Sequence, residues 1–319
     1  MGVAEQPERR RCAVIFNPTK VSEDFRTTVS RQLVPTAWEE PIWLETTEHD
    51  PGHSMAARAV EAKVDLVIAA GGDGTVRIVA NGLASSGIPM GVVPAGTGNL
   101  LAHSLDLPLK EAEAVEVALQ MHTRVIDLIK LTVDDRASEH FAVMAGTGMD
   151  AMIMDETNDD LKKVIGPGAY FLATAKALGR LPIDMAITLD GGRPHRRRAM
   201  ICVIGNVGTL TGGITLLPRA KADDGRLDVY VASPHRFTHW IRVFIRLITF
   251  RRHADDRVDE WQGTRVQVRL DHPDSYQLDG DVAEDECRTL TAEVVPGALT
   301  VCVTSEEGLA AAGGVDRRT

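Results

Sequence analysis

Short apolar runs alternate with segments of helical composition through the first third of the chain. The run Asp65–Ala70 is apolar at almost every position, which is typical of a strand buried on both faces. Alternation of strand, loop and helix predicts parallel strands with covering helices, and so an α/β domain. The expected strands are Cys12–Phe16, Ile42–Glu45, Asp65–Ala70 and Met90–Val93, and the expected helices are His53–Ala62, Val76–Leu83, a stretch from Leu100, and Lys110–Met121.

The pattern changes near Arg124, where strand-like runs begin to follow one another. Gly191-Gly192 predicts a hairpin turn, and helical segments are expected near 161–178 and 235–253. We therefore predict an α/β domain over 11–124 and an antiparallel β domain over 125–303, followed by a tail, 304–319, that packs back on the first domain or is disordered. The expected strands are Ile126–Val133, Phe141–Ala145, Ile183–Leu189, Ala199–Gly205, Leu227–Ala232, Thr264–Leu270, Ser275–Leu278, Leu290–Val295 and Leu299–Val303.

Composition and charge narrow the class of protein. The chain is 44% hydrophobic and 25% charged, as a globular protein is, and 35 basic against 45 acidic residues give a formal charge of −10. A net negative charge argues against a nucleic-acid partner. Three of the four cysteines, Cys12, Cys202 and Cys302, sit in Val/Ile-rich runs, which predicts buried thiols in a reducing, cytoplasmic setting. We find neither a secretory signal nor an apolar run near the ~20 residues that span a bilayer.

The strongest chemical signal is the loop Gly71-Gly72-Asp73-Gly74-Thr75, which lies between a buried strand and a helix. Glycines let the backbone approach a bulky anion, and the N–H groups of a helix start can bind phosphate oxygens. Asp73 would hold Mg²⁺ through water or accept a proton from an attacking hydroxyl. The alternative is a tight turn with Asp73 as a helix N-cap.

A second loop, Gly96-Thr97-Gly98-Asn99, also follows a buried strand and precedes a helix. Two such loops on neighbouring parallel strands would face one another across one crevice, one taking phosphates and the other ribose or base. No Gly-Lys-Ser/Thr follows the glycines, so this is not a Walker A loop, and the spacing does not fit the dinucleotide fingerprint.

Taken together, these motifs resemble the catalytic domain of the diacylglycerol kinase and sphingosine kinase family, in particular its soluble bacterial lipid kinases. The glycine–aspartate loop alone is shared with NAD kinases and phosphofructokinases, but the whole series is far more specific. It covers roughly residues 11–303 in the right order. The similar segments are Phe16–Thr19, Gly71–Thr75, Asn81-Gly82, Pro94–Asn99, Gly146–Ala151, Gly166–Tyr170, Pro218–Asp228 and Leu278–Asp281.

The resemblance implies a two-domain kinase with its active site between the domains. The first domain would be a Rossmann-like α/β domain of the phosphofructokinase and NAD kinase type that binds ATP, and the second an all-β sandwich that takes the lipid. Thr47 lies in the segment Thr46-Thr47-Glu48. The residues implied at the nucleotide are Asn17, Pro18, Thr19, Thr47, Gly72, Asp73, Gly74, Thr75 and Thr97.

The resemblance also assigns a metal site and a proton acceptor. Asp224 is the implied side-chain ligand of Mg²⁺, with backbone carbonyls at Lys221 and Arg226. Asp281 falls where the family places a glutamate that accepts the proton, and Asp279 is its neighbour. From the tripeptide alone, residues 279–281 would be interpreted as a hairpin turn. The sequence leaves open whether Asp73 or Asp281 is the catalytic base.

Departures from the family pattern leave other functions open. Val21 replaces a common glycine, Arg77 and Ile78 replace an Asn-Glu pair, and Leu100 replaces an acidic residue. The alternatives are an NAD kinase-like enzyme, against which the second loop and the 279–281 motif argue, and a catalytically weak protein that senses nucleotide or lipid.

The segment 237–252 bears on the substrate. Its apolar residues recur at helical spacing, and Arg242 and Arg246 share another face. Such a helix either packs on the β domain or lies on anionic headgroups. The basic cluster 193–198 has the same two interpretations, solvated turn or headgroup contact. We expect an enzyme of the cytoplasm that acts on a lipid substrate at the inner membrane face, as a monomer or an oligomer.

Overall fold

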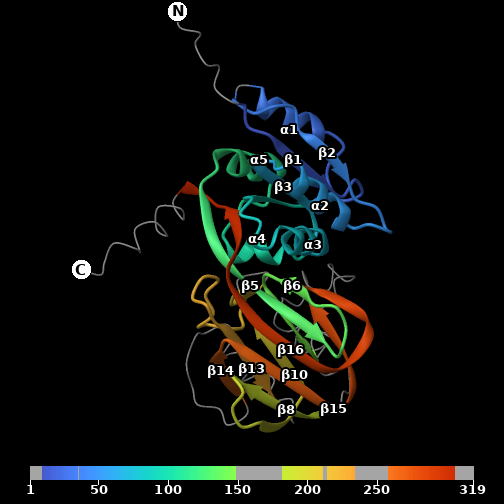
Figure 1. The fold of residues 1–319 in the computed structure, drawn as a ribbon, viewed down its shortest axis with the longest axis vertical. Helices are drawn as coiled ribbons and strands as arrows, with labels where there is room; N and C mark the ends of the chain where they lie inside the picture. The colour runs from blue at the N-terminus through green and yellow to red at the C-terminus, as the bar shows by residue number, and fades with distance from the viewer. Residues whose placement is uncertain (1–8, 35, 149–181, 211–213, 234–257, 306–319) are drawn as a thin grey trace, which may run out of the picture. The chain divides into compact units, whose positions relative to one another are not determined.

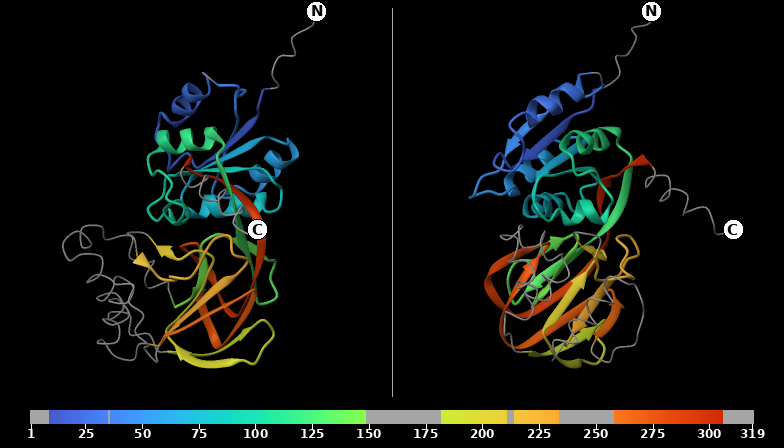
Figure 2. Two further views of the ribbon diagram at one scale, coloured as in Figure 1. Left: turned by 90° about the vertical axis from the view of Figure 1, so that its left-hand side faces the viewer. Right: turned by 180° about the vertical axis from the view of Figure 1, so that it is seen from behind.

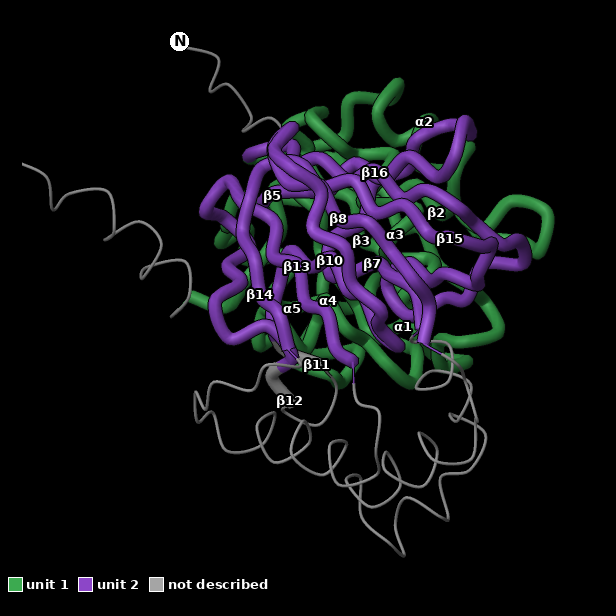
Figure 3. The backbone as a smooth tube through the Cα atoms, turned by 90° about the horizontal axis from the view of Figure 1, so that it is seen from below, with its two compact units in different colours: residues 1–126, 297–319 green, residues 127–296 purple. Residues whose placement is uncertain are grey.

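The computed structural model describes residues 9–34, 36–148, 182–210, 214–233 and 258–305. The chain divides into two compact units, which Figure 3 colours separately: unit 1 comprises residues 1–126 and 297–319, and unit 2 comprises residues 127–296. The predicted boundary after residue 124 lies two residues from the observed one. Residues 297–303, however, were assigned to the second domain and belong to unit 1.

Unit 1 is built on a parallel sheet in which the order of the first four strands is β2-β1-β3-β4. This is the α/β architecture that the alternating pattern predicts (Figure 1). Its strands are β1 (Cys12–Phe16), β2 (Ile42–Glu45), β3 (Leu66–Gly71) and β4 (Met90–Pro94), and its helices are α1 (Phe25–Leu33), α2 (His53–Glu61), α3 (Asp73–Leu83), α4 (Leu100–Ser104) and α5 (Glu111–Gln120).

Helices cover both faces of this sheet (Figure 2). On one face Val14 and Phe16 of β1 pack with Phe25 and Val29 of α1, and α1 contacts α5. Helices α2 and α3 contact each other, and α3 contacts β3. Because the strands are buried on both faces, every residue of β1 and β3 is inaccessible, which explains their continuous apolar sequences.

Unit 2 consists of antiparallel strands in its described residues. Strand β5 (Thr123–Val133) enters it from unit 1, and β16 (Asp281–Cys302) leaves it for unit 1, where Val301 pairs in parallel with Met90 of β4. That pairing places residues after 297 with the first unit. The other strands are β6 (Glu139–Phe141), β7 (Met144–Thr147), β8 (Ile183–Leu189), β9 (His195–Ala199), β10 (Ile201–Gly205), β11 (Thr209–Leu210), β12 (Ile214–Thr215), β13 (Leu227–Ala232), β14 (Val258–Gly263) and β15 (Arg265–Leu278).

Strand β15 pairs with a different strand along each of its two halves. Its first half, Val266–Leu270, pairs with β8, and its second half, Tyr276–Leu278, pairs with β7. Between them the register against β16 shifts, as a bulge or irregularity does when it bends a strand. One bent strand therefore replaces the two separate strands that the sequence predicts, and its residues Val266, Val268, Leu270, Tyr276 and Leu278 belong to one buried cluster of the unit.

The hairpin at Gly191-Gly192 is confirmed, but its second strand is β9, which the sequence analysis did not include. Arg197 of β9 donates to both carboxylate oxygens of Asp259 in β14, at 2.6 and 2.9 Å. His195 stacks on Trp261 of the same strand, with ring centroids 5.2 Å apart. In the described residues β9 and β14 each have one backbone partner, so each lies at an edge of the sheet. The side-chain contacts between β9 and β14 protect these edges.

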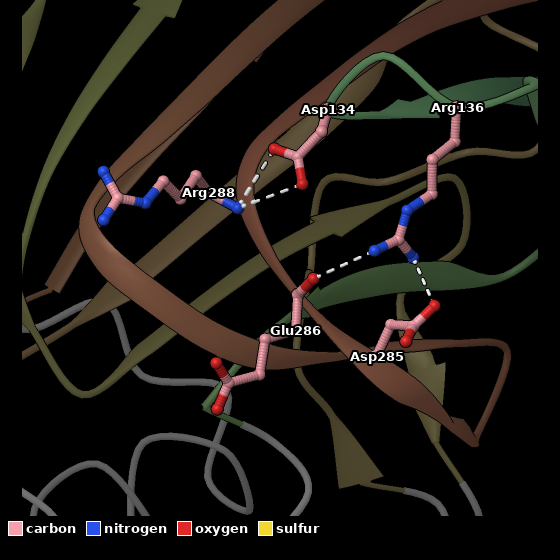
Figure 4. A network of polar contacts seen from close by, with 5 residues as sticks. All are labelled: Asp134, Arg136, Asp285, Glu286 and Arg288. Carbon is pink, nitrogen blue, oxygen red and sulfur yellow. Dashed lines mark hydrogen bonds and ion pairs between the residues drawn. The ribbon is translucent and has the colours of Figure 1, made fainter.

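The turn between β5 and β6 is fastened to β16 by the polar network in Figure 4. The Asp134 carboxylate accepts the backbone N–H of Arg288 at 3.1 Å. Arg136 forms a 3.0 Å ion pair with Asp285 and donates to the carbonyl of Glu286 at 3.3 Å. The side chains of Arg136 and Asp285 are exposed, so their ion pair contributes little to the free energy of unfolding. These contacts instead fix the position of the turn.

The expected buried thiols are confirmed, since all four cysteines are buried and unpaired. Burial raises the pKa of Cys202 to about 12, so it is an inert core thiol. No helix among the described residues is long and apolar enough to span a membrane. The expected helices near 161–178 and 235–253, the membrane segment 237–252, the motif 166–170 and the tail after 305 lie outside the described residues.

Candidate functional site

The loops that follow β1 to β4 all lie at one edge of the unit 1 sheet. Parallel strands end at the same edge, and the order β2-β1-β3-β4 reverses its direction between β1 and β3. In open α/β sheets, ligands bind outside the carboxyl ends of the strands at such a switch point. The loops 17–19, 46–47, 71–75 and 94–99 are therefore gathered where a ligand would bind.

The two glycine loops contact one another directly. The backbone N–H of Ala95 donates to the carbonyl of Gly71 at 2.9 Å. A Cβ atom on Gly96 would lie 2.7 Å from the Cα of Gly72, closer than real Cβ contacts, so only glycine fits at residue 96. The two loops therefore lie side by side at this edge of the sheet.

Asp73 joins the loops through its carboxylate. One oxygen accepts the N–H of Asn99 at 2.8 Å, and the other accepts the N–H of Leu100 at 2.6 Å. Those amides belong to the start of α4, whereas α3, which Asp73 itself begins, has no side-chain cap. Asp73 is thus not the N-cap of its own helix, whose N-cap is Gly72, and its carboxylate instead binds the amides at the start of the next helix.

Asn99 closes the second loop on itself. Its backbone is left-handed (φ 47°, ψ 44°), a conformation that asparagine tolerates better than most residues. Its side-chain oxygen accepts the N–H of Gly96 at 2.9 Å, and its Nδ2 donates to the Gly96 carbonyl at 2.8 Å. The loop is therefore held in one shape by its own residues and by Asp73.

The loops after β1 and β2 form the rest of this edge. Asn17 accepts the N–H and the hydroxyl of Thr19, at 3.0 and 2.8 Å, so both side chains are held beside Pro18. Thr46 is buried, whereas Thr47 is exposed and accepts the N–H of Asp50 at 3.0 Å. Exposure makes Thr47, rather than Thr46, the threonine available to a ligand.

Asp279 and Gly280 form a two-residue hairpin turn in unit 2, and Asp281 begins the strand that follows. Asp279 and Gly280 both have positive φ (45° and 95°), as in a type I′ turn, and Leu278 pairs with Asp281. The Asp279 carboxylate is buried and accepts three backbone amides, from Ala142, Val143 and Met144, at 2.9–3.0 Å. Asp281 is exposed at the start of β16. Asp279 therefore anchors the turn that presents Asp281.

The loop before β13 gathers acidic groups. Burial raises the pKa of Asp224, and repulsion from Asp127 adds to the rise. Burial also raises the pKa of Asp228, to about 6. Asp127 accepts the N–H of Gly225 at 2.7 Å, and the side chains of Lys221 and Arg226 are exposed. Among the residues that the structure describes, no three His, Cys, Asp or Glu side chains are grouped to hold a metal ion.

Two of the positions that depart from the family pattern, Val21 and Ile78, serve packing. Ile78 is buried in α3, and Val21 packs against the core of unit 1.

Sequence reasoning missed Asp127, Asp228 and Asn206, all of which are buried. Asp127 and Asn206 could have been noticed as polar residues next to apolar strand sequence, but their partners could not.

Comparison with known families covers most of the chain. Residues 11–131 match the diacylglycerol kinase catalytic domain, and residues 142–303 match the YegS C-terminal NAD kinase beta sandwich-like domain. The diacylglycerol kinase of Mycobacterium tuberculosis (strain CDC 1551 / Oshkosh) is 34% identical over 259 residues, covering 79% of this chain and 81% of that protein. The diacylglycerol kinase of Staphylococcus saprophyticus is 31% identical over 230 residues, covering 70% and 73%.

Solved structures share the fold. The crystal structure of a diacylglycerol kinase from Bacillus anthracis has a TM-score of 0.69 at 22% identity and covers 95% of this chain and 99% of its own. An NAD kinase from Archaeoglobus fulgidus, in complex with ATP, has a TM-score of 0.52 at 12% identity and covers 97% and 100%. These similarities support the two-part α/β and β sandwich-like architecture.

The contact between the loops can be tested with Gly96→Ala. The added methyl would meet backbone rather than a flexible side chain, so we expect a loss of about 1–3 kcal/mol of stability and at least tenfold weaker ATP binding. Thermal unfolding and calorimetric titration measure the two effects. Gly72→Ala is the matched stability control, since its Cβ would make an ordinary 3.6 Å contact. Equal melting temperatures for the two variants would contradict the tight approach.

Proposed function

Because the chain belongs to the diacylglycerol kinase family, we propose that it is an ATP- and Mg²⁺-dependent lipid kinase that phosphorylates the hydroxyl of a membrane lipid, such as diacylglycerol or a sphingoid base. Family membership agrees with the resemblance inferred from the motifs and makes the chain a kinase. The observation that carries the finer proposal is the bonding of Asp73 to the second glycine loop, which makes one cradle from two loops.

Unit 1 would bind the nucleotide through its backbone. Neither glycine loop contains lysine or arginine, so phosphate oxygens would be bound by amides of the first turn of α3, which have no partners within the helix. The exposed hydroxyl of Thr97 is a further donor, whereas Thr75 is buried at the start of α3. The Asp73 charge, which would otherwise repel phosphate, is bonded to the amides at the start of α4.

The residues around Asp224 suit a hard divalent cation. Carboxylates and backbone carbonyls are the ligand types that Mg²⁺ prefers, and mutual repulsion between Asp224 and Asp127 is the kind of strain that a cation relieves. Asp224, with the carbonyls of Lys221 and Arg226, would hold it. When bound, Mg²⁺ neutralises negative charge on phosphate oxygens.

Asp281 is our candidate for the proton acceptor. It is exposed on a turn that the buried Asp279 carboxylate fixes with three hydrogen bonds. Both Asp73 oxygens, in contrast, already accept amides. In this proposal Asp73 keeps the cradle in shape, and Asp281 takes the proton of the lipid hydroxyl as the phosphoryl group is transferred.

The central experiment measures transfer from labelled ATP to diacylglycerol, sphingosine, phosphatidylglycerol and NAD⁺. We expect a lipid to be labelled and NAD⁺ not to be. Asp281→Asn should lower kcat ~10²–10⁴-fold, because a positioned base is lost. Its melting temperature should not change, because Asp281 is exposed. Asp73→Asn should lower both turnover and stability, because one oxygen acceptor is lost.

Several results would contradict the proposal. Labelling of NAD⁺ alone would favour the NAD kinase-like alternative, and ATP binding without any transfer would favour a sensing protein. Normal turnover by a folded Asp281→Asn variant would remove Asp281 as the base, and normal turnover by Asp73→Asn would remove Asp73 from the cradle.

A lipid substrate requires contact with a bilayer, and we propose that basic residues provide it. Arg196 and Arg198 are exposed on β9, and the segment 237–252 carries Arg242 and Arg246. In vesicle sedimentation, Arg242→Glu with Arg246→Glu should weaken binding to anionic vesicles but not to zwitterionic ones. Arg196→Glu with Arg198→Glu tests β9 in the same way. Unchanged binding by a pair removes that pair from the membrane contact.

A further inference from the structure

Asn206 follows strand β10 and is completely buried. Its Nδ2 donates to two backbone carbonyls, that of Asp127 at 2.8 Å and that of Ala142 at 2.9 Å. Its backbone N–H donates to Val143 at 2.8 Å. The orientation of the amide is settled by these partners, because the opposite one would set its oxygen against two carbonyl oxygens.

The Ala142 carbonyl belongs to a segment that contacts the turn carrying Asp281. The segment from Ala142 to Met144 is bound by Asn206 through its carbonyls and by the Asp279 carboxylate through its three amides. The backbone N–H of Asp279 donates in return to the Met144 carbonyl at 2.8 Å. The position of the turn is thus set by a segment that Asn206 holds.

The other partner leads to the loop that carries Asp224. Asp127 accepts the N–H of Gly225 at 2.7 Å through its carboxylate, and its own N–H donates to the Ala222 carbonyl at 2.6 Å. Asp127 therefore binds this loop on both sides of Asp224. The backbone carbonyl of Asp127 in turn accepts a hydrogen bond from Nδ2 of Asn206.

We propose that Asn206 is a positioning residue that fixes the Asp281 turn and the Asp224 loop relative to each other. Its side-chain oxygen accepts no hydrogen bond from any residue that the structure describes. A buried unsatisfied oxygen is costly, so packing alone does not account for an amide here. What the amide provides, and an aliphatic side chain cannot, is a pair of donors directed at two carbonyls.

This inference deepens the proposed function. Only the expected effect on catalysis rests on the proposed function, whereas the positioning role does not. In Asn206→Ala, hydrogen exchange should quicken about tenfold or more at the amides of 142–144 and of Gly225, because Ala142 loses one buried bond and Asp127, whose carboxylate binds the Gly225 amide, loses the other. We expect kcat for the lipid to fall ~10–100-fold with KM for ATP within about twofold, since small misplacements of reacting groups are costly. Exchange mass spectrometry and steady-state kinetics on the full chain measure these effects.

Asp190→Ala is the matched control. The Asp190 carboxylate also accepts three hydrogen bonds in unit 2, from the N–H and hydroxyl of Thr264 and the N–H of Arg265, but it fixes a different turn. It should lower the melting temperature without changing exchange at 142–144, and with little change in kcat; exchange at Gly225 is left out of the control because the neighbouring Arg226 interacts with the Asp190 carboxylate. Should Asn206→Ala fail to fold, Asn206→Ser keeps a smaller polar group and serves for the same two measurements.

The outcomes separate the two proposals. Faster exchange at only one of the two segments, or equally throughout unit 2, would overturn the positioning role whether or not a lipid is phosphorylated. Faster exchange at both segments with unchanged kcat would overturn its catalytic part. If no lipid is labelled by the parent chain, the proposed function fails, and the exchange result still decides whether Asn206 couples the turn and the loop.

Discussion

The candidate nucleotide site depends on one ionic hydrogen-bond pair, the Asp73 carboxylate with the amides of Asn99 and Leu100. The two glycine loops also meet through the Ala95 N–H and the Gly71 carbonyl, and the Asp73 carboxylate adds a link from the start of α3 to the start of α4. With it, the start of α3 and the start of α4 become one rigid edge. A carboxylate at a helix start is stabilised by the amides there, so the bond holds the loops together and screens the Asp73 charge beside the proposed phosphate site.

Unit 2 uses the same device on a different scaffold. Asp279, Asp127 and Asp190 are carboxylates that each bind backbone amides and so fix a turn or a loop. Residues that would do chemistry, Asp281 and Asp224, are exposed beside these anchors. The two anchors beside these residues, Asp279 and Asp127, are buried, and an exposed side chain next to a buried anchor can be held within the small tolerance that phosphoryl transfer would demand.

Much of this could be predicted from the sequence, since apolar runs such as Cys12–Phe16 match observed strands. Helix α1 was missed although Phe25, Val29 and Leu33 have helical spacing, because its other residues are polar. Strand β9 was missed because its sequence, HRRRA, has no apolar alternation, and contacts with β14 stabilise it instead. The partners of Asp73 and Asn206 were beyond prediction, because they lie far away in the chain and meet only once the sheets have formed.

The measurement that tests the shared cradle most directly is a titration of the isotopically labelled chain with ATP and Mg²⁺, followed by the backbone amide signals of residues 71–75 and 96–99. If the loops form one site, signals from both must shift together and give the same dissociation constant. Shifts confined to one loop, or two different constants, would show that the loops do not act as a single phosphate cradle.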